Sequence, residues 1–397
     1  MTNPVLTTTT SAFEEPPSAV GVVRSPALFL RECLAGLVTS LALIPEVISF
    51  SFVTGVDPQV SLLASVVLGL VMSLLGGRPA MVTAAAGSVA LVVGPTIKAH
   101  GTQYLLPIVV LAGLLQVACG AAGIARALRH VPRSVMMGFV NALGILIFWA
   151  QVPHVSQPSG AVLVLLVLTL AIVHFLPRIT QAVPSALVAI AAATAAAQLA
   201  GLAVPHVSDD GALAAGLPGL RVLLVPLNLD TLRISAPAAL SAAFVGLLES
   251  LLTAQLVDEM TGTSSDKGRE SWALGIANLC SGFFGGVAGC AMIGQTVVNV
   301  QLGRARSRVS TVVAALLLLA LVTALSPVMA RIPMVALAGV MMVVALKTID
   351  WRALCWSRLG RVPFAETGVM ALTVAVTVAT GNLAIGVAAG VLLAKVL

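Results

Sequence analysis

The chain has 397 residues, of which 59% are hydrophobic and only 9% are charged, and its mean hydropathy is +1.07. Soluble domains carry roughly 25% charged residues, so this composition excludes a water-soluble enzyme and indicates an integral membrane protein surrounded mostly by lipid. The net charge of +6 does not indicate a nucleic-acid-binding protein, because the basic residues lie singly between apolar runs and form no patch.

Residues 1–29 are polar, contain Glu14 and Glu15, and lack the basic-then-apolar order of a signal peptide. We expect them to form a disordered N-terminal tail. Beyond them, apolar runs that are long enough, or nearly so, to cross a bilayer as helices follow one another. These runs lie at about 32–54, 58–76, 104–125, 133–153, 160–176, 183–203, 236–258, 272–285, 309–331, 332–347, 363–380 and 381–396.

Two further segments, 86–98 and 288–302, are shorter and are interrupted by glycine. They predict half-helices that end inside the membrane, and counting them as segments 3 and 10 gives 14 segments in an all-α fold. With the N-terminus inside, all but four of the 21 basic residues lie on the cytoplasmic side, the exceptions being Lys98, Arg221, Arg233 and Arg331. Such a positive-inside bias supports both the segment number and the orientation.

The two halves of the chain share a pattern. Glu46 and Glu249 each lie deep in the first span of a half. Gly87 follows Glu46 by 41 residues, and Gly289 follows Glu249 by 40 residues, and both glycines open a short segment. Because seven segments per half is an odd number, the second half runs in the opposite direction. We therefore predict a seven-plus-seven inverted repeat, with a binding site between the halves.

Several other polar residues are given structural roles. The cysteines show neither metal spacing nor a CxxC pair, so we expect no metal site, no cofactor and no disulfide framework; they are Cys33, Cys119, Cys280, Cys290 and Cys355. Gln116, Asn141 and Asn278 are expected to hydrogen-bond neighbouring helices. Asp258 and Glu259, at a predicted cytoplasmic helix end, are taken as loop or gate residues.

Three stretches carry a family resemblance: LALIPEVISFSFVTGVDPQVSL, GLLESLLTAQLVDEMTG and GQTVVNVQLGRARS. Over about 30–397 the sequence resembles the SulP family of anion transporters, known in animals as solute carrier family 26. The resemblance implies a bacterial inner-membrane protein with a cytoplasmic N-terminus that works as a homodimer. It also implies a core domain (30–130 and 236–331) and a gate domain (131–235 and 332–397). Family members carry a cytoplasmic STAS domain after the last span; this chain stops at Leu397, so we expect that domain to be absent or removed.

The half-helices suggest how an anion is bound. The first N–H groups of a helix are unpaired and carry partial positive charge, so two helix starts that converge would cradle an anion. The candidate substrate-binding residues are Gly87, Ser88, Val89, Ala291, Met292, Gly294, Gln295 and Thr296, with Phe50 and Thr253 nearby. Animal relatives carry an arginine where this chain has Gln295. For each glycine taken singly, helix packing is an equally good interpretation.

Glu46 and Glu249 are the candidate coupling residues, because an ionised carboxylate inside a bilayer is costly and such groups are retained for function. Protonation would remove the repulsion between a carboxyl and a bound anion, which predicts proton-coupled symport of a small anion, with a dicarboxylate such as fumarate preferred. The alternative is sodium-coupled transport of bicarbonate or sulfate: in sodium-coupled relatives an acid at the position of Glu249 and a threonine at that of Thr253 bind Na⁺. Here, however, Ile293 stands where a third ligand is expected. Nucleobase–proton symport and an anion channel also remain open, and no motif of an intramembrane enzyme is present.

Overall fold

The computed structural model describes residues 18–123, 131–156, 159–180, 184–209, 225–226, 228–351 and 364–396. In chain order the elements are α1 (Ala19–Arg24), α2 (Pro26–Thr54), α3 (Pro58–Leu75), β1 (Thr83–Ala85), α4 (Gly87–His100), η1 (Thr102–Tyr104), α5 (Leu105–Ala121), α6 (Arg133–Val155), α7 (Gly160–Ile179), α8 (Ser185–Leu199), η3 (Val207–Asp209), α9 (Leu229–Thr261), α10 (Lys267–Phe283), β2 (Gly289–Ala291), α11 (Ile293–Val297), η4 (Val298–Leu302), α12 (Arg308–Met329), α13 (Met334–Thr348), α16 (Phe364–Thr380) and α17 (Leu383–Val396). Elements η1 and η3 are 3-10 turns, and η4 is a π-helical turn that continues α11.

Local sequence sets several helix starts. The side chains of Asp57, Asn228 and Asp266 accept hydrogen bonds from backbone N–H groups in the first turns of α3, α9 and α10. Pro58 occupies the first turn of α3, where a missing N–H costs nothing. These caps make the long helices begin at defined residues before any tertiary contact is considered.

The distribution of side chains confirms a helical membrane protein. Among the described residues, α2, α3, α5 with η1, α6, α7 and α9 are long and apolar enough to cross a bilayer, and several shorter apolar helices accompany them. Large apolar side chains lie on the outside, as at Ile179 (82% exposed) and Leu199 (90% exposed). Many serines, threonines and asparagines are buried instead. Polar groups thus face the interior and apolar groups face lipid, as the absence of water in a bilayer requires.

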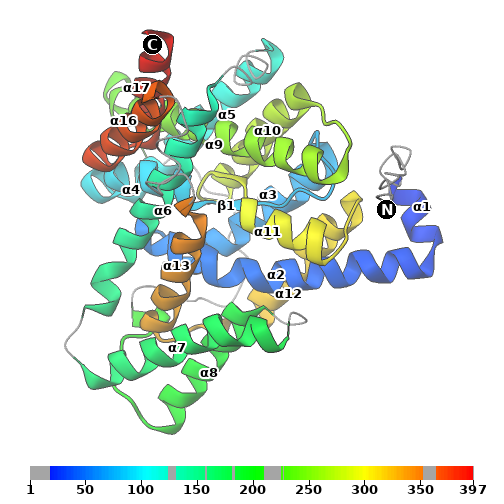
Figure 1. Cartoon of the computed structure of the whole chain (residues 1–397), viewed down its shortest axis with the longest axis vertical. Helices are drawn as coiled ribbons and strands as arrows, with labels where there is room; N and C mark the ends of the chain where they lie inside the picture. Colours follow the sequence, from blue (N-terminus) through cyan, green and yellow to red (C-terminus); the bar gives the residue numbers. More distant parts are fainter. Residues whose placement is uncertain are drawn as a thin grey trace, which may run out of the picture.

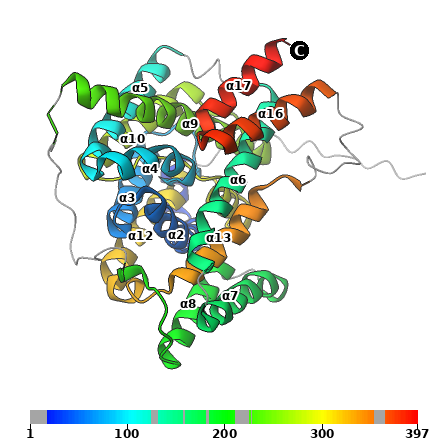
Figure 2. The ribbon, with the colours of Figure 1, turned by 90° about the vertical axis from the view of Figure 1, so that its left-hand side faces the viewer.

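The helices pack in two groups. In the first, α2, α3, α5, α9, α10 and α12 contact one another, and α4 packs against α2 and α9. In the second, α6 contacts α13, α16 and α17, while α7 packs on α8 and α13. Figure 1 and Figure 2 show α7 and α8 together at one end of the molecule and α16 with α17 near the opposite end. Fewer contacts join the groups, mainly α2 with α13 and α9 with α17.

Near the centre of the first group, β1 and β2 form a two-stranded antiparallel sheet in which Thr83 pairs with Ala291 and Ala85 with Gly289. The fold is otherwise helical, as the sequence predicted, but the sequence did not predict these two short strands. The physical reason is that a chain broken inside the protein leaves N–H and C=O groups without helical partners, and the two broken segments pair with each other.

Two boundaries differ from the expectation. The predicted tail 1–29 is helical over Ala19–Arg24 and again from Pro26, so a fully disordered tail is wrong for those residues; residues 1–17 lie outside the described part. The segment predicted at 288–302 is not one half-helix but a strand, an α-helical turn and a π-helical turn. Arg221 and Cys355 also lie outside the described residues.

Candidate functional site

Two strand–helix units cross at the centre of the molecule. Each three-residue strand leads through one extended residue, Ala86 or Met292, into a helix, α4 or α11. Within the described part of the chain neither helix has a side-chain cap, so no side chain occupies the N–H groups of either first turn. Both helices pack against α2 and α9, the helices that carry Glu46 and Glu249.

Glu249 is held by two neutral donors. The Ser88 hydroxyl, in the first turn of α4, donates a hydrogen bond to Glu249 Oε2. The Cys290 thiol, in β2, donates to the same oxygen over 3.1 Å. The Ser88 Oγ and Cys290 Sγ atoms also lie 3.6 Å apart, within hydrogen-bonding distance for sulfur. The carboxyl therefore joins both crossing units to α9, and it is buried, with 6% of its side-chain surface exposed.

Glu46 occupies the corresponding place on α2. Its side chain lies close to that of Gln295 in α11 and near enough to Glu249 for the two carboxyl groups to influence each other. Unlike Glu249, it is only half-buried. Each acid thus contacts the helix start from the other half of the chain: Glu249 contacts α4, and Glu46 contacts α11.

The glycines of the site differ in what surrounds them. The ring of Phe50 lies so close to Gly87 that a Cβ atom there would overlap it. Gly294, in contrast, is exposed and would place a Cβ with nothing within 4 Å. The site therefore opens at Gly294 and is closed by Phe50 at Gly87.

The other predicted residues help to build the crossing. The Thr296 hydroxyl accepts a hydrogen bond from the Val82 N–H (3.0 Å), and the Thr253 hydroxyl donates to the Glu249 carbonyl oxygen one turn earlier in α9 (2.8 Å). Val89 and Ala291 are fully buried, and Met292 is 5% exposed. The structure thus brings all the predicted residues to one region, and it gives the two threonine hydroxyls partners within the protein.

A cavity of about 480 Å³ lies between α6 and the second half of α9. Leu248 and Leu251, which flank Glu249 in the sequence, line it together with Gln255, Glu259 and Arg133. The basic residues predict that this side of the molecule is cytoplasmic. The cavity therefore runs along α9 toward the residues around Glu249.

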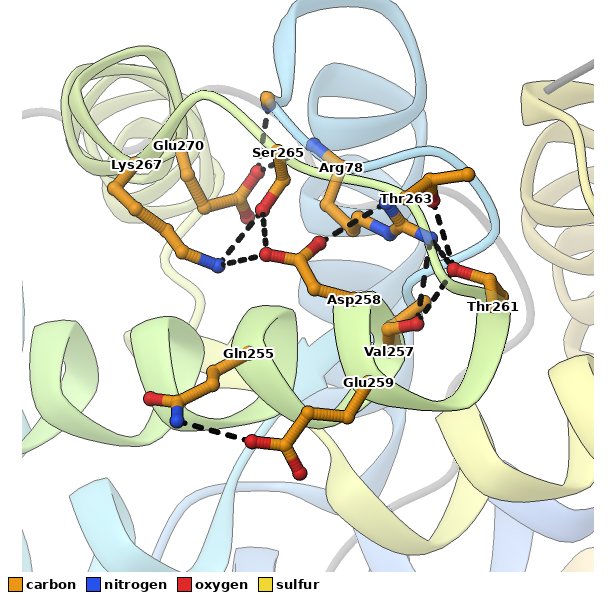
Figure 3. Close-up of polar contacts among 11 residues, drawn as sticks. Arg78, Gln255, Val257, Asp258, Glu259, Thr261, Thr263, Ser265, Lys267 and Glu270 are labelled. Atoms are coloured by element: carbon orange, nitrogen blue, oxygen red, sulfur yellow. Dashed lines mark hydrogen bonds and ion pairs between the residues drawn. The ribbon is translucent and has the colours of Figure 1, made fainter. Parts of the chain in front are cut away.

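Sequence reasoning missed a cluster of charges at the connection between α9 and α10 (Figure 3). Asp258 forms ion pairs with Arg78 (3.0 Å) and Lys267 (2.6 Å). Glu270 accepts hydrogen bonds from the backbone N–H groups of Gly77 (2.6 Å) and Arg78 (3.1 Å). We call Arg78, Asp258, Lys267 and Glu270 the charge cluster. It fastens the loop after α3 to α9 and α10, whereas the sequence had indicated only that Asp258 is a loop or gate residue.

Cys290 was also missed as a site residue, because its spacing carries no metal or redox pattern. The expected hydrogen bonding between helices is confirmed for Gln116 and Asn278, whose side chains join α5 to α10 over 2.7 Å. Asn141 likewise accepts a hydrogen bond from the Asp350 N–H over 2.7 Å. Among the described residues, no cation forms an ion pair with Glu46 or Glu249.

Known proteins resemble this chain along most of its length. A Bacillus subtilis protein named "Putative sulfate transporter YbaR" is 48% identical over 366 residues, covering 92% of this chain and 76% of that protein. The bicarbonate transporter BicA of a Picosynechococcus species is 28% identical and covers 81% of this chain and 62% of its own length.

Solved structures show the same fold. The transmembrane domain of a cyanobacterial bicarbonate transporter BicA superposes with a TM-score of 0.79 at 24% identity, covering 91% of this chain and 97% of that one. Murine Slc26a9 in the inward-facing state gives a TM-score of 0.80 at 16% identity, covering 92% of this chain and 68% of the other. The sulfate permease family model matches residues 29–161 and 153–373. The chain therefore belongs to the sulfate permease family of membrane anion transporters.

Proposed function

We propose that the chain is a secondary active transporter that binds a small anion at the starts of α4 and α11. The observation that carries this proposal is the convergence of two uncapped helix starts beside the opening at Gly294. Unpaired N–H groups at helix starts attract negative charge without any arginine or lysine. The ends of discontinuous helices form binding sites in this way in other membrane transporters.

We propose that transport is coupled to protons through Glu46 and Glu249. Neither carboxyl is paired with a cation among the described residues, so each can exist protonated and neutral as well as ionised. A nearby anion favours the protonated form, and protonation in turn favours anion binding, so the two ligands bind together. Glu46 is the better candidate for the exchanging group, because it is half-buried and faces Gln295 in α11.

The two packing groups of helices support an alternating-access motion. We propose that the first group is the core and the second the gate, arranged as a seven-plus-seven inverted repeat. Weaker contact between the groups than within them favours relative movement, and the cavity between α6 and α9 lies at their boundary. Further parts of the proposal are a homodimer in the bacterial inner membrane and a cytoplasmic N-terminus.

Fumarate represents the dicarboxylates that we prefer as substrates, while the names of the relatives make sulfate and bicarbonate the first alternatives. Sodium coupling is the alternative to proton coupling. It is disfavoured because the Ile293 side chain offers no ligand at the position where a third one is expected. Nucleobase transport is disfavoured because Phe50, an aromatic residue beside the site, packs on Gly87.

The test is uptake by purified protein in liposomes. Labelled fumarate, sulfate and bicarbonate are offered separately, with an imposed proton gradient, an imposed sodium gradient or neither. We expect an inward proton gradient to drive accumulation of one of these anions. Accumulation driven by sodium alone would reject proton coupling, and failure to carry any anion would reject the function.

Glu46→Gln tests the coupling residue, because glutamine keeps the hydrogen-bonding shape but cannot bind a proton. We expect anion exchange at equal concentrations on both sides to persist while the proton gradient no longer drives accumulation. Glu259→Gln is the control, since Glu259 is exposed, lines the cavity between α6 and α9 and bonds only Gln255 among the described residues. An unchanged proton dependence in Glu46→Gln would remove Glu46 from the coupling role.

A further inference from the structure

The outer edges of the sheet at the crossing lack backbone hydrogen-bond partners within the sheet. The sheet has only two strands of three residues each, so each strand has an outer edge whose N–H and C=O groups face away from the sheet. Inside a membrane protein, water does not supply the missing partners, and an unpaired backbone group costs free energy. The edges of this sheet must therefore be satisfied by side chains.

Side chains from three helices accept three of the outward N–H groups. Ser65 lies on α3, Ser250 on α9 and Asn278 on α10. The pairs are Ala85 N–H to Ser65 Oγ (3.1 Å), Ala291 N–H to Ser250 Oγ (3.0 Å) and Gly289 N–H to Asn278 Oδ1 (2.8 Å). Since Ala85 and Gly289 are partners in the sheet, each end of that pair is held from outside.

Asn278 differs from the two serines because it satisfies both backbone groups of one residue. Its Oδ1 accepts from the Gly289 N–H, and its Nδ2 donates to the Gly289 carbonyl oxygen over 3.2 Å. The amide thus acts as a short piece of a third strand. Nδ2 also donates to Gln116 Oε1 (2.7 Å), and Gln116 Nε2 donates to the Ala243 carbonyl oxygen (3.4 Å). Both side chains are buried, with at most 1% of their surface exposed.

The position of Gly289 determines the positions of two parts of the candidate site that follow it in the chain. The next residue is Cys290, whose thiol donates to Glu249, and α11 begins four residues after Gly289. Gly289 packs closely on β1, because a Cβ atom at this position would overlap the Ala84 carbonyl oxygen. A displacement of β2 would therefore move the Cys290 thiol and the start of α11 together.

We propose that Asn278, held in place by Gln116, is the positioning residue of the anion site: it fixes β2 and thereby the start of α11 and the Cys290 contact with Glu249. Its effect on transport rests on the proposed function. Its effect on the position of β2 does not, and the two are measured separately.

The position of β2 is read from the reactivity of the Cys290 thiol toward N-ethylmaleimide. The other four cysteines, Cys33, Cys119, Cys280 and Cys355, are replaced by serine so that only Cys290 is labelled. In Asn278→Ala we expect labelling to accelerate by about tenfold or more, the equilibrium equivalent of losing one or two hydrogen bonds that hold β2 in place.

Asn141→Ala is the matched control. Asn141 is also an asparagine with 0% exposure, and it bonds the Asp350 N–H, but it lies on α6 and has no contact with β2 among the described hydrogen bonds. We expect this variant to lose thermal stability to a comparable degree without faster labelling of Cys290. Equal acceleration in both variants, or none in Asn278→Ala, would overturn the proposal.

Transport provides the second measurement, with fumarate, sulfate and bicarbonate as probes. We expect Asn278→Ala to raise the KM of the transported anion by about tenfold while Asn141→Ala leaves it within about twofold of the parent value. The double variant Asn278→Gln with Gln116→Asn keeps both amides and their total volume. It should reverse much of the rise in KM that either single change causes. An additive double variant, or a KM unchanged in Asn278→Ala, would contradict a positioning role.

Should Asn278→Ala fail to fold, Gln116→Met replaces it. That change leaves the hydrogen bonds between Asn278 and Gly289 in place but removes the bond from Asn278 to Gln116. A smaller rise in the rate of Cys290 labelling is therefore expected. Labelling at the parent rate would reject the proposal. Should the parent protein carry none of the three anions, the proposed function fails, but the labelling comparison still decides whether Asn278 positions β2.

Discussion

The carboxyl groups at the strand crossing and those of the charge cluster are held in different ways. Glu249 accepts hydrogen bonds from a hydroxyl and a thiol, both neutral. Asp258 is paired with the cations of Arg78 and Lys267. Both acids lie on α9, nine positions apart in the sequence. One helix therefore carries one acid in a neutral setting, where its partners are uncharged hydrogen-bond donors, and another in an ionic setting, where its partners are cations.

The two acids differ in their partners because, in the part of the chain that the structure describes, cations lie near the end of α9 but not at the strand crossing. Near the end of α9, Arg78 and Lys267 pair with Asp258, and the ion pairs fix the connection between the helices in one arrangement. At the crossing, Glu249 accepts hydrogen bonds from neutral donors, and no cation forms an ion pair with it among the described residues. Under the proposed function, a carboxyl without a paired cation gains and loses a proton, whereas the charge cluster joins the loop after α3 to α9 and α10.

The largest stability effect is expected where the ionic setting is broken. Asp258→Asn leaves the Arg78 guanidinium, 4% exposed, without its counter-charge. Removing one member of a buried ion pair costs about 3 kcal/mol or more. The thermal unfolding temperature of the purified protein should fall markedly. If it falls no further than in Asp230→Asn, which alters an exposed pair of 3.9 Å, the charge cluster has no structural role.

A somewhat smaller loss is expected from Gly289→Ala at the crossing. The new methyl group would overlap the Ala84 carbonyl oxygen and the Leu68 side chain, and overpacking of this kind costs about 1 to 3 kcal/mol. Gly294→Ala is its control, because open space surrounds that position. Thermal unfolding should separate the two variants, while uptake of the transported anion should be impaired in both. A stable Gly289→Ala protein would show that the sheet tolerates movement.

Ser88→Ala sharpens the comparison by removing one neutral donor from Glu249. Because the Cys290 thiol remains, we expect a stability loss of only about 1 kcal/mol. The effect on uptake should be larger and should alter its dependence on pH, since the setting of the carboxyl changes. Ser40→Ala serves as the reference, as the Ser40 hydroxyl is buried but bonds only the Leu37 carbonyl oxygen among the described residues. Identical pH profiles for the two variants would argue against a role for Ser88.

The smallest effect is expected for Lys267→Ala. The Lys267 side chain is 30% exposed, and partly exposed ion pairs contribute about 0.2 to 1 kcal/mol. Its contribution should shrink further in high salt, because ions screen exposed charges. The stability loss in Ser88→Ala should be insensitive to salt. A salt-sensitive Ser88 variant and a salt-insensitive Lys267 variant would reverse the distinction between the two settings.

Much of the site could be predicted from local sequence. Long apolar runs gave the spans, because lipid requires about twenty apolar residues for each crossing helix. The glycine-broken segments were recognisable for the same reason, being too short to cross. Glu46 and Glu249 stood out because acids are rare in such runs. Each of these signals lies within one segment and needs no knowledge of its neighbours.

Contacts between distant segments could not be predicted in this way. The pairing of β1 with β2 joins residues about 200 positions apart, and neither strand has a side-chain pattern long enough to identify it. Cys290 and Asn278 look like ordinary interior residues of a membrane protein. Their roles appear only when the crossing places the thiol against Glu249 and the amide against Gly289.

By itself the sequence determined that the chain crosses a membrane as helices, that two segments are broken and that two acids lie within spans, since these follow from the cost of polar groups in lipid. The tertiary structure alone decided which partners those groups find. It set Glu46 against α11 and Glu249 against α4, and it gave each strand edge a side chain from another helix. Burial favours the pairing of polar groups, but the choice of partner depends on how the helices pack.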